Sequence, residues 1–227
     1  MQKQESIMKK TYLLLIFFLL TGIVNAQEKL DINFDSIKTV ILKGNTYKEL
    51  LTRYEVNDST LTKNDYSILY YGQLFRKSYS LGSDNRSTKI KTYLKSKEYD
   101  KAFDLCKKAL DDNPVSLEAL CDIITSGSEQ KKPQKELNKY IDKYWKILKL
   151  IASTGDGKSE NSGFKVICVN DEYQLMYSYF NVNGITSQSL VGNCDLIEFA
   201  SSKYFTGNKM YFDVSQVLLK EQELFSK

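Results

Sequence analysis

The spacing of apolar residues changes once along this chain, near residue 155. Before that point apolar side chains recur every three or four positions, as in Tyr99, Ala102, Phe103 and Cys106, which is the spacing of one helix face. After it they alternate or run continuously, and the β-branched and aromatic residues that strands prefer become common. The change predicts an α+β fold in which an N-terminal helical layer packs on a small C-terminal antiparallel sheet.

The helical half opens with two short helix candidates, at about Phe34–Leu42 and Tyr47–Tyr54. Thr62 then has the position of an N-cap, and Asp65 three residues later completes an arrangement like a capping box. These residues predict that a third helix begins directly after Thr62.

A repeat-like pair of helices is predicted at about residues 88–127. Its spacing resembles that of a tetratricopeptide repeat, in which small residues let antiparallel helices approach and a proline ends the pair. Arg86 and Ile90 stand where the motif prefers Trp and Gly, so we expect one hairpin inside a larger helical layer rather than a solenoid. The matching residues are Tyr99, Ala102, Ala109 and Pro114.

A long amphipathic helix is predicted from Pro133, which tolerates the first turn, to a stop near Gly155. A row of lysines repeats on its polar side at helical spacing. We favour a solvated helix face, and docking of an anionic glycan or lipid headgroup is the alternative. The lysines are Lys132, Lys135, Lys139, Lys143 and Lys146.

The second half has the pattern of a meander. Phe164–Val169 is apolar on both faces, which predicts a central strand. Tyr173–Phe180 follows as a strand, with a helix as the alternative. Asn183-Gly184 is a typical hairpin turn, which would pair this segment with Ile185–Val191.

The last part of the chain predicts another hairpin and a helix. Leu196–Phe205 and Lys209–Asp213 would pair about Gly207-Asn208, and a short helix would begin at Val214.

The N-terminal segment is predicted to be a cleaved signal peptide over residues 1–26. Lys9 and Lys10 supply its positive charge, Tyr12–Leu20 its apolar run, and Val24-Asn25-Ala26 the small residues of a cleavage site. An uncleaved anchor is the alternative, but the run is shorter than the roughly 20 residues that span a bilayer. We therefore expect a periplasmic or secreted protein with no membrane span after cleavage.

The rest of the chain is predicted to be one domain, because no spacer rich in Pro, Gly or Ser divides it. Its boundaries are 27–227, with a helical part over 27–155 and a mainly β part over 156–227. The net charge of the whole sequence is only +4, which gives no reason to expect a nucleic-acid partner. We expect a monomer.

Four cysteines leave the redox state open. An even number in an oxidising compartment permits two disulfides, whereas four buried thiols would act as small apolar side chains. We favour thiols, and Cys168 with Cys194 is the better candidate for a bridge, since both are expected on the sheet. The other two are Cys106 and Cys121.

The absence of histidine excludes Ser-His-Asp and Cys-His catalysis and His-based zinc sites. We expect no metal and no cofactor. The remaining candidates lie near the change of pattern. Gly155, Asp156 and Gly157 could aim backbone N–H groups at a ligand, with Asp171 as a further ligand-binding residue. Asp156 and Glu172 are the candidate catalytic pair, although Gly-Asp-Gly is also an ordinary turn.

Two functions therefore compete. One is a non-enzymatic binding or scaffold module of the cell envelope, with an envelope protein or a glycan as partner. The other is a carboxylate-dependent hydrolase acting on a glycan, which would require carboxyl groups roughly 5 to 9.5 Å apart. An apolar patch on the helical face would favour the first function, and the distance between Asp156 and Glu172 would decide the second.

Several segments together resemble a family of exported Bacteroidetes proteins known as a domain of unknown function, number 4919. The resemblance would extend over nearly all of the chain that follows the signal peptide. It implies the α-then-β layout and an extracytoplasmic location, and it supplies no reaction. The segments are Leu50-Leu51-Thr52-Arg53-Tyr54, Asp58-Ser59-Thr60-Leu61-Thr62, Leu69-Tyr70-Tyr71-Gly72, Tyr99 to Pro114, Ser153 to Ser159, Phe164 to Tyr173, Cys194-Asp195 and Tyr211-Phe212-Asp213.

Overall fold

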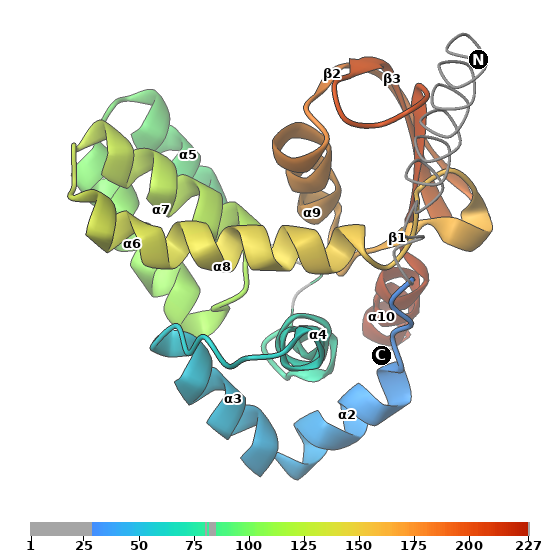
Figure 1. Cartoon of the computed structure of the whole chain (residues 1–227), viewed down its shortest axis with the longest axis horizontal. Coiled ribbons are helices and arrows are strands. Elements are labelled where there is room, and N and C mark those ends of the chain that lie inside the picture. The colour runs from blue at the N-terminus through green and yellow to red at the C-terminus, as the bar shows by residue number, and fades with distance from the viewer. Residues whose placement is uncertain (1–28, 80, 82–84, 227) are drawn as a thin grey trace, which may run out of the picture.

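The computed structural model describes residues 29–79, 81 and 85–226, so the predicted signal peptide lies outside the described residues. The fold is α+β, as predicted, with helices first and a four-stranded sheet after them. The long helix α8 (Gln134–Ala152) crosses the middle of the molecule, with α5 to α7 at one end and the sheet at the other (Figure 1). Within the described part of the chain, none of the helices has the length and apolarity needed to cross a bilayer.

The helical layer follows the predicted order. Thr62 caps α4 in a complete capping box: its hydroxyl accepts from the Asp65 N–H, and the Asp65 carboxylate accepts from the Thr62 N–H. The described helices before α8 are α2 (Phe34–Lys43), α3 (Asn45–Glu55), α4 (Lys63–Tyr71), the 3₁₀ helix η1 (Gly72–Phe75), α5 (Ser87–Lys95), α6 (Tyr99–Asp112) and α7 (Leu117–Glu129).

The tetratricopeptide-like hairpin is confirmed as α6 packed on α7, with α5 against both. Ala102 and Ala109 are almost completely buried, which is the close approach that small residues permit. A small second core of its own holds this end together, around Ile90, Phe103 and Cys106.

The sheet has the strand order β1-β4-β3-β2. Three of its strands form the predicted antiparallel meander: β2 (Val182–Val191), β3 (Cys194–Ser202) and β4 (Lys209–Asp213). β1 (Phe164–Lys165) pairs with β4 in parallel. The chain ends in α10 (Ser215–Phe225), which begins where the sequence predicted.

The prediction of a central strand over Phe164–Val169 is wrong. Only Phe164–Lys165 is a strand, and it lies at the edge of the sheet. The following residues are apolar because they enter the core, and the chain turns into α9 (Val169–Gln174). A π-helix, η3 (Leu175–Tyr179), continues it, so the helical alternative for Tyr173–Phe180 is the correct one.

The predicted hairpin turn at Asn183-Gly184 is wrong as well. Both residues lie inside β2, where Asn183 pairs with Ser201. Gly184 has a φ of 64° and adjoins the irregular register between Ile185 and Ser187. A glycine with positive φ therefore marks a bulge here rather than a turn, and strand pairing alone distinguishes the two.

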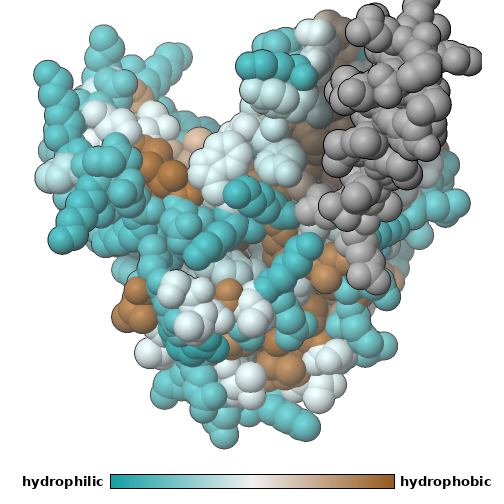
Figure 2. All heavy atoms as spheres, viewed as in Figure 1, coloured by the Kyte–Doolittle hydropathy of each residue, from teal (hydrophilic) through white to brown (hydrophobic). Residues whose placement is uncertain are grey.

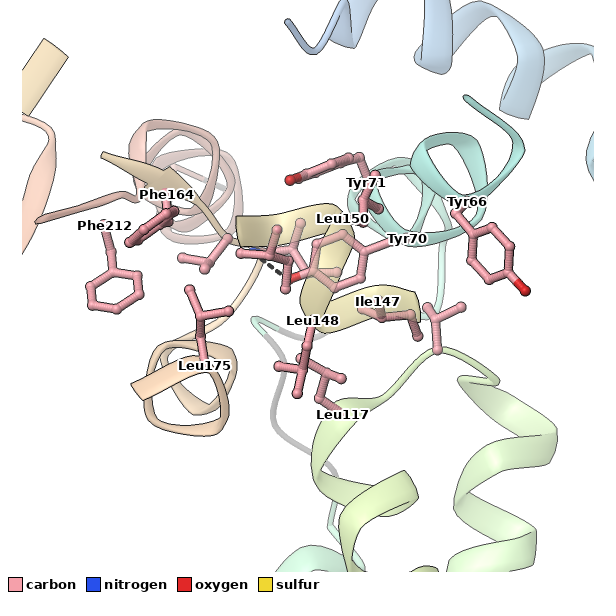
Figure 3. Packing of buried hydrophobic residues seen from close by; sticks show 14 of the residues in the cluster. Tyr66, Tyr70, Tyr71, Leu117, Ile147, Leu148, Leu150, Phe164, Leu175 and Phe212 are labelled. Carbon is pink, nitrogen blue, oxygen red and sulfur yellow. Dashed lines mark hydrogen bonds between the residues drawn. The ribbon is translucent and has the colours of Figure 1, made fainter. Parts of the chain in front are cut away.

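One continuous apolar core joins the helical layer to the sheet. Figure 3 shows Phe164 and Phe212 side by side at one end of it and Tyr66 at the other, with Leu148 and Leu150 of α8 between them. The long helix is therefore the element that both halves share.

The lysine row of α8 is not a uniform solvated face. Lys143 is only 9% exposed, and its Nζ donates to the Glu55 carbonyl and lies 4.5 Å from the centre of the Tyr54 ring. Burial lowers the pKa of Lys143 to about 8. Lys132 and Lys139 also lie over aromatic rings, of Phe103 and Tyr140. The aliphatic parts of these lysine side chains thus cover apolar surface.

Candidate functional site

A recess with a volume of about 630 Å³ lies where α7 meets α9. We call it the α7–α9 pocket. Its walls come from η1, from the described residues 78, 79, 85 and 86 between η1 and α5, from the α6–α7 connection and from the start of α9. Its lining is mainly polar: Gln73, Ser78, Tyr79, Asn85, Arg86, Asp112, Asn113, Val115, Ser116, Glu118, Ile167, Cys168, Asn170 and Asp171.

Asp171, a residue singled out from the sequence, lies at the inner wall of this pocket and is only 3% exposed. The Tyr70 hydroxyl donates to its Oδ2 at 2.6 Å. Burial raises the pKa of Asp171 to about 6, although hydrogen bonds from Tyr70 and Cys168 act in the opposite direction. The carboxyl group is thus held at a fixed position by residues from two distant parts of the sequence.

Glu118 organises the neighbouring wall. Its carboxylate accepts from the Asn170 amide at 3.0 Å and the Ser87 hydroxyl at 2.8 Å, and it pairs with Lys91 at 2.5 Å. These contacts tie α5, α7 and α9 together around one acid. The wall therefore presents fixed polar groups rather than mobile side chains.

A second ion pair and an amide also line the pocket. Arg86 pairs with Asp112 at 2.7 Å and donates to the Lys108 carbonyl. The adjacent Asn113 has a buried Oδ1 that accepts no hydrogen bond from any described residue. Tyr79 donates to the Ile167 carbonyl at 2.6 Å, which fixes its ring as part of the lining.

Glu172 is not among the residues that line the α7–α9 pocket and is fully buried beside the sheet. Its Oε2 accepts from the Gln188 amide, which also contacts Asp195. Its Oε1 has no partner among the described residues. Burial, followed by the nearby Asp195 carboxylate, raises the pKa of Glu172 to about 10, so the group is protonated at neutral pH.

Replacing Glu172 by glutamine is expected to stabilise the protein at neutral pH by about 2 kcal/mol. Folding raises this pKa above the ordinary value of 4.5, so folding favours the protonated form. The stability that the protonated carboxyl group contributes is fully present below about pH 4.5 and is lost as the pH rises through about 10. Glutamine has no proton to lose, so the variant keeps this stability over the whole range. Urea unfolding of both proteins across this range measures the difference, and a difference that does not grow with pH would contradict the assignment.

The Gly155-Asp156-Gly157 loop serves its own fold. The N–H groups of Asp156 and Gly157 both donate to the Ser162 carbonyl, and Asp156 Oδ1 accepts from the Lys158 N–H. A Cβ on Gly155 would lie 2.2 Å from that same carbonyl oxygen. Gly155 is thus explained by close packing inside the loop, and Gly157 by its close approach to the Phe164 ring.

The three acidic residues of the predicted site lie in three different places. Asp171 lines the α7–α9 pocket, and Glu172 is enclosed by Gln188 and Asp195. Asp156 is exposed in the loop between α8 and β1. The sequence order that suggested one constellation does not bring these acids into one set of contacts.

All four cysteines belong to the described part of the chain and are thiols rather than disulfides. Cys168 and Cys194 have different neighbours: Cys168 adjoins Asp171, whereas the Cys194 thiol donates to the Glu160 carbonyl. The described residues contain no group of His, Cys, Asp and Glu that could hold a metal ion.

The sequence did not single out most of the pocket. In the sequence, Arg86 is notable only as a departure from the repeat motif. No motif singles out Glu118, Asn113 or Asn170 individually. The segment Tyr70-Tyr71-Gly72, by contrast, stands out through the family resemblance, and Tyr70 does contact Asp171.

Residues 35–223 match the model of the family described as a domain of unknown function, DUF4919. No curated protein and no solved structure matches the chain.

Proposed function

From the premise that the chain belongs to the DUF4919 family, we propose that it is a non-enzymatic binding module of the cell envelope whose ligand site is the α7–α9 pocket. The observation that carries the proposal is the pocket itself. Its volume of about 630 Å³ is in the range of ligand sites, and its polar groups converge from several elements.

The balance of charges indicates which ligand the pocket would bind. Three carboxyl groups line the pocket, those of Asp112, Glu118 and Asp171, against one cation, Arg86. Ion pairs of Asp112 with Arg86 and of Glu118 with Lys91 offset two of the three acidic charges. Amide, hydroxyl and carboxylate groups remain as hydrogen-bond donors and acceptors. This composition suits a neutral, hydroxyl-rich ligand, and we propose a glycan.

Binding rather than hydrolysis fits the positions of the acids. Glu172 is completely enclosed, so its carboxyl group has no path to a glycosidic oxygen. Asp171 is held by Tyr70 deep in the pocket wall and can orient a hydroxyl group. The other carboxylates of the lining, Asp112 and Glu118, are held in ion pairs with Arg86 and Lys91, so we assign them to structure rather than to a hydrolytic pair with Asp171.

Replacing Asn113 by leucine is expected to weaken glycan binding by about tenfold, because it removes a polar side chain of the pocket lining. Calorimetric titration with maltotriose, cellotriose and tri-N-acetylchitotriose measures the affinity. Asn170→Leu is a second variant, since it removes an amide donor from another element of the lining, α9.

Asn64→Leu is the matched control, because Asn64 is exposed on α4 and is not part of the pocket. The control should bind as the unmodified protein does. If none of the saccharides binds, or if all three variants bind equally, the pocket is not a glycan site.

We also propose that the protein is exported and that its mature N-terminus is Gln27. The charged, apolar and small-residue segments of residues 1–26 support this. The expected result is an intact mass that lacks residues 1–26 for protein recovered from the periplasm or the medium. A mass that still includes them, in a membrane fraction, would contradict the proposal.

A further inference from the structure

A second recess, of about 410 Å³, lies where the C-terminal half of α8 meets the start of α4 and the end of η3. The face drawn in Figure 2 shows apolar and hydrophilic side chains next to one another over this part of the molecule. We call this recess the α4–α8 groove and define it by Leu61, Lys63, Lys146, Lys149, Leu150 and Tyr179.

The charge in the α4–α8 groove has one sign. Three lysines line it, and none of the lining residues that the structure describes is acidic. Lys146 is paired with Asp142, one turn earlier on α8, at 2.8 Å. Lys63 and Lys149 are exposed, and neither forms an ion pair with a described residue. Two ammonium groups are thus available to an anion.

The floor of the groove is apolar. Leu150 is only 2% exposed and belongs to the main core, and Leu61 and Tyr179 are partly buried against that core. Tyr66 also lines the groove, its hydroxyl points away from the core residues drawn in Figure 3, and Lys146 lies over its ring. A simple inorganic anion would leave this apolar floor unused.

We propose that the α4–α8 groove binds a long-chain carboxylate, with the carboxylate between Lys63 and Lys149 and the chain along Leu61, Leu150 and Tyr179. Charge complementarity selects the head group, and burial of apolar area selects the chain. The recessed shape fits a single chain better than a membrane surface, which requires a protruding apolar face. The lining residues differ from those of the α7–α9 pocket, so this site is independent of the glycan proposal.

The test compares dodecanoate with methyl dodecanoate, which has the same chain without the charge. Trp145 is the single tryptophan, and its ring lies 6.5 Å from that of Tyr179, so its fluorescence reports on the groove. Titration calorimetry provides an independent affinity. We expect dodecanoate to bind at least about tenfold more tightly than the ester. We also expect the double variant Lys63→Gln/Lys149→Gln to lose that preference.

The matched control is Lys48→Gln/Lys135→Gln, which removes two exposed lysines outside the groove. It should bind dodecanoate as the unmodified protein does. Equal binding of acid and ester, unchanged binding by the groove variant, or no binding of dodecanoate would each overturn the proposal. Binding of anionic phospholipid vesicles without binding of dodecanoate would overturn it in favour of a membrane surface.

Discussion

Replacing Phe212 by alanine is expected to lower the free energy of unfolding by about 3–5 kcal/mol, the usual cost of removing a buried aromatic ring. Phe212 on β4 has no exposed surface, and its ring centre lies 6.0 Å from that of Phe164. Both rings belong to the core that also contains residues of α8. The loss of stability should therefore affect the helical layer as well as the sheet.

The measurement is urea unfolding followed by two signals. Far-ultraviolet circular dichroism reports on all helices, and fluorescence of Trp145 reports on the surroundings of this residue on α8, which include Tyr179 of η3. If residues 27–227 form one cooperative domain, both midpoints should shift together. Two separate transitions, with the Trp145 signal unchanged, would show that the halves unfold independently.

Tyr204→Ala is the control for this experiment. Tyr204 is also aromatic and close to the sheet, but 62% of it is exposed. Its removal should change stability by no more than about 0.5 kcal/mol.

Replacing Gly157 by alanine is expected to destabilise the protein by about 2–5 kcal/mol, the sum of a backbone and a packing cost. Gly157 has a φ of 67°, which a residue with a Cβ adopts only at a cost. The new Cβ would also lie 2.3 Å from the Phe164 ring. Because that ring is part of the core, it cannot move away freely.

Gly44→Ala separates these two costs. Gly44 has a similar φ of 80°, but nothing lies within 4 Å of the position its Cβ would take. The free energy of unfolding of the Gly44→Ala variant should fall only by the backbone cost, about 1–2 kcal/mol. Thermal and urea unfolding of both variants gives the comparison. Equal losses of stability in the two variants would show that the Phe164 ring moves aside, and that packing does not require a glycine at position 157.

The limits of the local sequence are clearest in the candidate site. Asp171 is predicted as a ligand-binding residue, and it does line the α7–α9 pocket. Glu172, its neighbour, is predicted as the catalytic partner of Asp156 and is enclosed beside Gln188 instead. Adjacent residues on a helix point in different directions, so the helix at α9 decides which of them reaches the pocket.

The sequence by itself determined the helical layer, its capping box at Thr62 and its repeat-like hairpin, because helix periodicity, caps and close helix packing depend on residues a few positions apart. It also determined the meander of β2, β3 and β4 in outline. Only the tertiary structure decided that the apolar segment after Phe164 enters the core and becomes α9, and that Gly184 bends a strand instead of closing a hairpin. The physical reason is that apolar runs and positive-φ glycines are compatible with several local structures, and contacts with residues distant in the chain select among them.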